Sequence, residues 1–108
     1  MTVKTMAKVL ELKQLAGFQA EDQELKGCYI GDLLSRVIGK AVAGGIWITI
    51  MANVNVAAVA LLADVACVVL AEDVEPDEDL KAKCDAEGIP LYQSPKTAVE
   101  LATELYYQ

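Results

Sequence analysis

The stretch that decides the fold is IWITIMANVNVAAVALLADVACVVL, residues 46–70. Its first five residues, 46–50, are all β-branched or aromatic, which is the composition of a strand. The Ala-rich residues up to Ala63 predict a helix, and Asn53 is a suitable N-cap for it. The apolar run 66–70 then predicts a second buried strand. A strand, a helix and a strand in this order indicate a crossover unit of a parallel sheet.

The same alternation extends toward the N-terminus. The pattern predicts a helix, two strands and a second helix, over residues 3–12, 12–16, 28–30 and 33–41. Thr2 and Asp32 stand where the N-caps of the two helices are expected. Residues 18–26 are polar and are predicted to form a loop.

Toward the C-terminus, the acidic loop 72–79 leads to a helix that starts near Pro76 and Asp77. Gly88 is a suitable end for this helix, and a short strand is predicted over 89–92. Ser94 is expected to cap a last helix that has Pro95 at its first position and ends near Tyr106.

Together these elements predict the α/β class: a single three-layer α/β/α domain over residues 1–108, with a mostly parallel sheet. A chain of 108 residues fits one domain. Its composition, 55% hydrophobic but only 6% aromatic, indicates a core of Val, Ile, Leu and Ala, which suits a buried parallel sheet. The order of the strands stays open.

The charge distribution argues against binding to nucleic acid. The chain has a net charge of −7, and no basic residue occurs between Lys40 and Lys81. Proteins that bind nucleic acid normally neutralise phosphates with clustered Lys and Arg. We therefore expect no nucleic-acid partner.

The eighteen uncharged residues 46–63 raise the question of a membrane helix. Asn53 and Asn55 lie in the middle of the run, its residue preference changes halfway, and no basic cluster flanks it. A buried strand followed by a buried helix explains it better. Charged residues such as Lys8 also interrupt any signal-peptide core. We expect no membrane association and a cytoplasmic location.

Three cysteines, Cys28, Cys67 and Cys84, are far apart, and the chain has no histidine. Because zinc sites usually need four clustered Cys or His ligands, no zinc site is expected. Cys67 lies in an apolar run and is expected to be buried, whereas Cys28 and Cys84 are expected to be more exposed. Three free thiols fit a reducing compartment.

No catalytic residue, metal site or cofactor is predicted. Gly39-Lys40-Ala41 lacks the first glycine and the hydroxyl residue of a P-loop, and the dinucleotide-binding glycine pattern is absent. Without histidine the usual nucleophile–base sets cannot form. The acidic loop 72–79 lacks the spacing and the central glycine of an EF-hand, so a solvated loop that caps a helix is the preferred interpretation.

The remaining candidates are residues near helix N-termini, which bind anions in many α/β folds, outside the carboxyl ends of the strands. The candidate ligand-binding residues are Tyr29, Gly31, Asp32, Asn53 and Asn55. Each polar member has an alternative interpretation as an ordinary cap. Asn55 is the most suggestive, because one cap is enough for a helix. For Tyr29 a place in the core or an interface is the alternative.

Several pieces of the sequence resemble the DRTGG domain family in their order and spacing. They are GCYIGDLLS at 27–35, WITI at 47–50, NVAAVA at 55–60, the Pro76 loop, and EGIPL at 87–91. The resemblance covers nearly the whole chain and implies a fold like the N-terminal domain of the serine kinase that phosphorylates the phosphocarrier protein HPr. That domain carries no kinase activity. The name-giving motif is degenerate here, as DQELKG at 22–27.

The resemblance implies a regulatory or dimer-forming role, with an adenine nucleotide nearby. Our leading hypothesis is a non-catalytic regulatory or protein-interaction module, a homodimer that has a protein partner in a metabolic or redox system. The first alternative is a sensor that binds an anionic small molecule, such as an adenine nucleotide, at the helix starts near Asp32 and Asn55. The second alternative is a redox or electron-transfer accessory protein with a reactive Cys28 or Cys84.

Overall fold

The computed structural model describes residues 1–107. In chain order, the elements are α1 (Val3–Val9), β1 (Lys13–Ala16), β2 (Cys28–Ile30), α2 (Leu34–Lys40), β3 (Ile46–Thr49), α3 (Asn55–Ala63), β4 (Cys67–Leu70), α4 (Glu78–Glu87), β5 (Leu91–Gln93) and α5 (Ala98–Tyr106). Every predicted helix and strand is present, with ends that differ by a few residues.

The strands form one five-stranded sheet in the order β1-β5-β4-β3-β2. Strands β2 to β5 are parallel neighbours, and only β1 runs antiparallel, beside β5. Two strands therefore lie at the edges, β1 on one side and β2 on the other. The parallel strands follow each other in space as they do in sequence, so each crossover helix joins adjacent strands.

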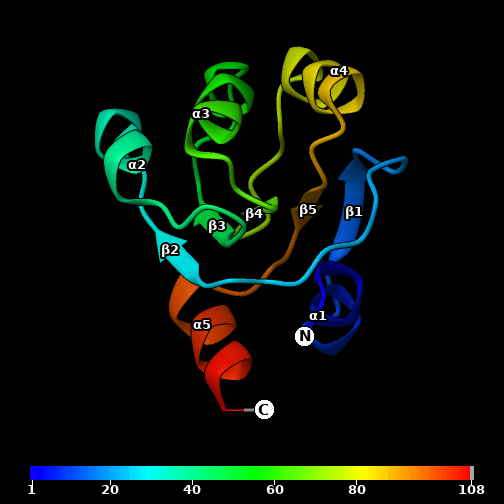
Figure 1. Ribbon diagram of the computed structural model, residues 1–108, viewed down its shortest axis with the longest axis vertical. Coiled ribbons are helices and arrows are strands. Elements are labelled where there is room, and N and C mark those ends of the chain that lie inside the picture. Colours follow the sequence, from blue (N-terminus) through cyan, green and yellow to red (C-terminus); the bar gives the residue numbers. More distant parts are fainter. Residues whose placement is uncertain (108) are drawn as a thin grey trace.

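Helices cover both faces of the sheet (Figure 1). α2, α3 and α4 lie side by side on one face, while α1 and α5 lie on the other. Alternate strand residues supply the two cores, because successive side chains point to opposite faces. Trp47 and Val68 pack under α2, α3 and α4, whereas Ile46 and Val69 pack on the side of α1 and α5. This arrangement confirms the predicted three-layer α/β/α fold with a mostly parallel sheet.

The decisive stretch folds as expected into β3, α3 and β4, and both strands are fully buried. The helix differs from the prediction, because only one face of it is buried, through residues that include Val56 and Ala60. Leu62, on the opposite face, is 71% exposed. Within residues 1–107, no helix is both long and apolar enough to cross a membrane.

Three predicted helix caps, at Asp32, Asn53 and Ser94, are wrong; the N-cap of α3 is Val54. Asp32 does not cap α2; the N-cap position belongs to Leu33, which has no side-chain hydrogen bond to offer. α5 begins at Ala98, and its cap is Thr97, whose hydroxyl accepts from the Glu100 amide while the Glu100 carboxylate accepts from the Thr97 amide. Thr2 does cap α1, as predicted.

Candidate functional site

The carboxyl ends of β2 and β3 carry the first part of the candidate site. Asp32 follows β2, and its Oδ1 accepts from the Thr49 hydroxyl at 2.8 Å and from the Ile50 backbone amide at 3.0 Å. Thr49 is 2% exposed, and its Oγ1 also accepts from the Met51 amide at 3.1 Å. Asp32 therefore joins two adjacent strand ends instead of starting a helix.

Gly31 lies in the same connection, and Tyr29 lies in β2, two residues before it. The indole nitrogen of buried Trp47 donates to the Gly31 carbonyl at 2.9 Å, and the Gly31 amide donates to Ile48 O at 3.2 Å. A Cβ at position 31 would lie 2.7 Å from Tyr29 Cε2, so any larger residue at this position would require the tyrosine ring to move. Tyr29 packs against the core under α2, α3 and α4. For Trp47 and Tyr29, contacts within the chain account for their positions.

The two asparagines lie at the start of α3. Asn53 Oδ1 accepts from the Asn55 backbone amide at 2.9 Å, which satisfies one free N–H of the first turn. Asn53 therefore supports the helix start, but the N-cap position belongs to Val54, so the predicted cap at Asn53 is wrong. The side chain of Asn55, the first residue of the helix, is exposed.

Sequence reasoning missed a second buried polar residue, at the end of β5. Gln93 is 6% exposed, and its Nε2 donates to Val74 O at 3.0 Å and to Glu75 Oε1 at 3.3 Å. This amide holds the acidic loop after β4 against the sheet. The available signal was a glutamine directly after the apolar residues 89–92, at a point where a strand was predicted to end.

The acidic loop is fixed by backbone contacts as well. Glu72 and Asp73 both have φ near +60°, at 59° and 57°. Their amides donate to Lys96 O and Ser94 O, both at 2.9 Å. Ser94, the predicted cap, instead accepts from the Lys96 amide through its hydroxyl at 3.1 Å. Within residues 1–107, no three His, Cys, Asp or Glu residues are placed to hold a metal ion together.

Of the five predicted ligand residues, the structure brings Tyr29, within β2, together with Gly31 and Asp32, which directly follow β2, and it pairs Asn53 with Asn55 after β3. Both groups lie at the carboxyl edge of neighbouring strands, as expected. Their polar atoms mostly serve contacts within the chain. Asn55 is the member whose exposed side chain remains available to a ligand.

The cysteines offer little reactivity. Cys84 is fully buried, so the expectation that it would be exposed is wrong, while Cys67 is buried and Cys28 partly buried, as predicted. Burial raises the pKa of Cys28 and of Cys84 to about 11 and raises the pKa of Cys67 further. Cys28 and Cys67 lie on strands β2 and β4, with Ile46 of β3 in register between them. Two strand spacings of about 4.8 Å exceed the Cα separation of a disulfide.

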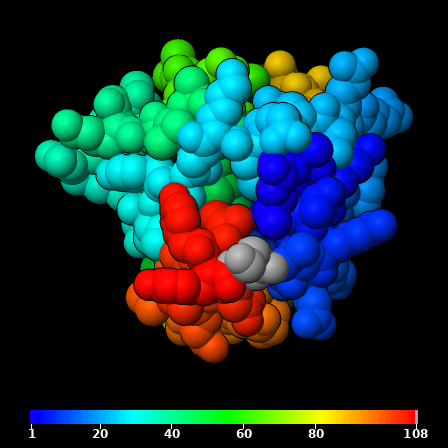
Figure 2. Space-filling view, turned by 60° about the horizontal axis from the view of Figure 1, so that its bottom comes forward, coloured from blue at the N-terminus to red at the C-terminus, as the bar shows by residue number. Residues whose placement is uncertain are grey.

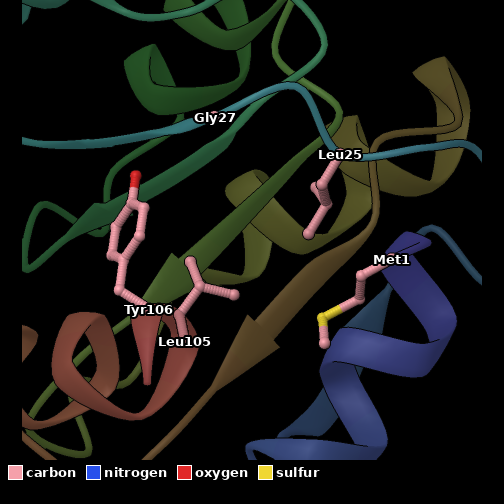
Figure 3. Close-up of a pocket in the computed structure, with 5 residues that line it drawn as sticks. All are labelled: Met1, Leu25, Gly27, Leu105 and Tyr106. Atoms are coloured by element: carbon pink, nitrogen blue, oxygen red, sulfur yellow. The ribbon is translucent and has the colours of Figure 1, made fainter. Parts of the chain in front are cut away.

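An apolar pocket lies on the face of the sheet that α1 and α5 cover, at the amino end of β2 (Figure 3). Its volume is about 210 Å³, and it is lined by Met1, Leu25, Gly27, Leu105 and Tyr106. Figure 2 shows this face, where α5 and α1 lie beside the connection between β1 and β2. The Met1 ammonium at the pocket is paired with Glu24 at 3.1 Å. No predicted site residue lines this pocket.

Comparisons with known proteins agree with the fold. No family model matches the chain, and no curated protein matches it. Among solved structures, the chain is similar to the CBS and DRTGG domains of the regulatory region of Clostridium perfringens pyrophosphatase, complexed with its activator diadenosine tetraphosphate. The TM-score is 0.71 at 9% identity, over 95% of this chain and 45% of that one. The chain thus spans less than half of that regulatory region, and the likeness supports a DRTGG-like fold.

Proposed function

We propose that this chain is a non-catalytic regulatory module that acts through protein association, as a homodimer. One observation carries the proposal: most of the polar groups at the carboxyl ends of β2 and β3 are hydrogen-bonded within the chain. In open α/β sheets, ligands and substrates usually meet such an edge. Here Asp32 is engaged by Thr49 and by the Ile50 amide, so its carboxylate already has two donors within the chain.

The thiols support the same conclusion. A reactive cysteine needs a thiolate near neutral pH, and burial raises the pKa of Cys28 and Cys84 to about 11. The redox alternative therefore has no support from the geometry. We also place the protein in the cytoplasm, where three unpaired thiols are stable.

The experiment is light scattering coupled to size-exclusion chromatography, over a hundredfold range of protein concentration. We expect the mass of a dimer, twice 11.6 kDa. A monomer at every concentration, with or without nucleotide, would contradict association as the mode of action. An isolated chain that turns over a substrate would contradict the non-catalytic part.

A second candidate function is the sensing of an adenine nucleotide. The similar pyrophosphatase region was solved with diadenosine tetraphosphate. Asn55 presents an exposed side-chain amide at the N-terminus of α3, where anions are favoured. Thermal shift with ATP, AMP and diadenosine tetraphosphate tests it, because a ligand that binds the folded state raises its stability. A shift that Asn55→Ala removes, and that the exposed control Ser35→Ala keeps, would support the sensor. No shift with any of the three would exclude it for these nucleotides.

A further inference from the structure

The outer surface of α2, α3 and α4 is defined here as the helical face. α3 is the middle helix and packs against both of its neighbours (Figure 1). Its buried residues point to the sheet, so its outer side is the centre of the helical face. The side chains on this outer side therefore determine which kind of partner can pack on the helical face.

The outer side of α3 is an apolar stripe. Val54, Ala58, Leu61 and Leu62 follow the i, i+4, i+7 and i+8 spacing of one helix side. The two leucines are 46% and 71% exposed, and Val54 is 40% exposed. Residues 41–63 carry no charge, and the first charged side chain after the stripe is that of Asp64, the C-cap of α3.

A helix that is apolar on every side is normally buried on every side. α3 has only one polar residue, Asn55, at its first position, yet Ala58, Leu61 and Leu62 are exposed as well. Contiguous exposed apolar patches of this kind mark surfaces that a partner covers.

The charges on either side of the stripe are opposite. α2 carries Arg36 and Lys40 and no acidic residue, which gives it a net charge of +2. α4 carries Glu78, Asp79, Asp85 and Glu87 against Lys81 and Lys83, which gives it −2. The helical face therefore runs from positive through neutral to negative across its three helices.

This pattern is complementary to itself. In a two-fold contact the same surface meets its own copy. A two-fold axis that lies in the plane of the contact and runs parallel to α3 packs α3 of one copy on α3 of the other. The same axis brings α2 of each copy over α4 of the other. The apolar stripe of α3 then packs on its own copy, and on both sides of it the +2 charge of α2 faces the −2 charge of α4. This complementarity acts against the repulsion between two chains that each carry a net charge of −7.

We propose that a second copy of this chain covers the helical face, with α3 packed on α3 across a two-fold axis and α2 of each copy facing α4 of the other. The inference rests on the proposed homodimer and assigns its surface. The face of α1 and α5 stays free in this assembly.

The first test is Leu62→Lys, with the dimer dissociation constant measured by sedimentation equilibrium. Leu62 is 71% exposed in the single chain, and lysine near the end of a helix is well tolerated, so the fold is kept. In the dimer the change puts two like charges into the apolar centre, and we expect the dissociation constant to rise at least about a hundredfold. Val99→Lys is the matched control, because Val99 is 72% exposed on α5, on the other face. We expect it to leave the dissociation constant within about twofold.

The second test uses the charges. Arg36→Glu with Lys40→Glu reverses the sign of α2, and Glu78→Lys with Asp79→Lys reverses that of α4. Each pair alone puts like charges opposite each other and is expected to raise the dissociation constant at least about tenfold, while all four changes together restore most of the affinity. A thermal melt of each variant verifies that the chain is folded. Restoration would separate lost complementarity from lost stability.

The outcomes separate the two proposals. If Leu62→Lys leaves the wild-type dimer intact, or if Val99→Lys breaks it, the helical face is not the dimer interface. The proposed homodimer itself is not contradicted by either result. If the variant with all four changes dimerises no more tightly than the two double variants, the arrangement of α2 over α4 is overturned. A wild-type chain that is monomeric throughout overturns the proposed association itself. A wild-type monomer that captures another protein only through Leu62 would make the occupant a different partner and overturn the second copy.

Discussion

The carboxylate of Asp32 accepts a hydrogen bond from the hydroxyl of Thr49 at 2.8 Å, across the ends of two parallel strands. A second bond from the Ile50 amide, at 3.0 Å, completes the contact. The pair therefore fixes how the connection into α2 leaves the sheet. Because the acceptor is a carboxylate oxygen and the hydroxyl is buried, the bond belongs to the stronger class of protein hydrogen bonds.

We expect Asp32→Ala to destabilise the fold by about 1–3 kcal/mol, since it leaves the buried Thr49 hydroxyl without its acceptor. Thr49→Val keeps the shape of the side chain and is expected to cost about 1 kcal/mol. In urea unfolding, the double variant should cost less than the sum of the two single ones, by about 0.5–1.5 kcal/mol. Additive losses would show that the two side chains act independently.

Gln93 anchors the acidic loop, and its removal should loosen that loop before the rest of the domain. Gln93→Ala takes away the donors to Val74 O and Glu75 Oε1 and should cost about 1–3 kcal/mol. Limited proteolysis with an enzyme that cuts after glutamate should then cleave first within 72–78. Gln19→Ala, an exposed glutamine, is the control and should leave cleavage unchanged. First cleavage elsewhere in the chain would contradict the anchoring role.

The cap of α5 can be tested against a neighbouring threonine on the same helix. Thr97→Ala removes the capping box and should lower stability by about 1 kcal/mol. Thr103→Ala, exposed in the body of the helix, should change it by less than about 0.5 kcal/mol. Equal effects in thermal unfolding would show that the capping box adds nothing.

Cys28 should react slowly with iodoacetamide. Its pKa of about 11 lies two units above the ordinary value of 9.0, so at pH 8 its thiolate fraction is about a hundredfold below that of a free thiol. The rate should rise about tenfold per pH unit from pH 8 toward 10. Intact mass against time measures it, with the Cys28→Ser variant as the control. A rate equal to that of free cysteine would contradict the burial of this thiol.

Asp22 should make stability depend on pH in the acid range. Its Oδ1 accepts from the Lys4 amide at 2.9 Å, and this bond is the main cause that holds the pKa of Asp22 below its ordinary 3.8. A carboxyl with a lowered folded pKa stabilises the fold above the unfolded pKa, and this contribution is lost as pH falls through the folded one. Asp22→Asn should therefore be less stable than wild type above about pH 4, with a gap that closes toward pH 2. A gap that stays constant from pH 6 to pH 2 would contradict this linkage.

The sequence predicted the architecture well because its signals there are local. Residues 46–70 contain a strand, a helix and a strand with few polar interruptions, and such a unit admits only a parallel crossover. Gly88 and Thr2 end and begin helices through contacts within one turn, and both were predicted correctly. The order of the strands was not predictable, since the pairing of β1 with β5 joins distant parts of the chain.

The candidate site was harder to predict, because its contacts are tertiary. Asp32 has the residue type of an N-cap, but the Thr49 hydroxyl and the Ile50 amide from the next strand compete for its carboxylate. Ser94 and Thr97 are both suitable caps by type. The decisive signal was Glu100 three residues after Thr97, which completes a capping box. Nothing local distinguishes the outer leucines of α3 from its buried alanines, so the exposed stripe required the structure.

The place of β1 in the sheet has a consequence for synthesis on the ribosome. Lys13 of β1 pairs with Gln93 of β5, so the partner of this strand is made 80 residues later. Strands β2, β3 and β4 each find their neighbour within the next crossover and can pair as they emerge. β1 has to wait unpaired until almost the whole domain has left the tunnel, and its docking is then the step that closes the sheet.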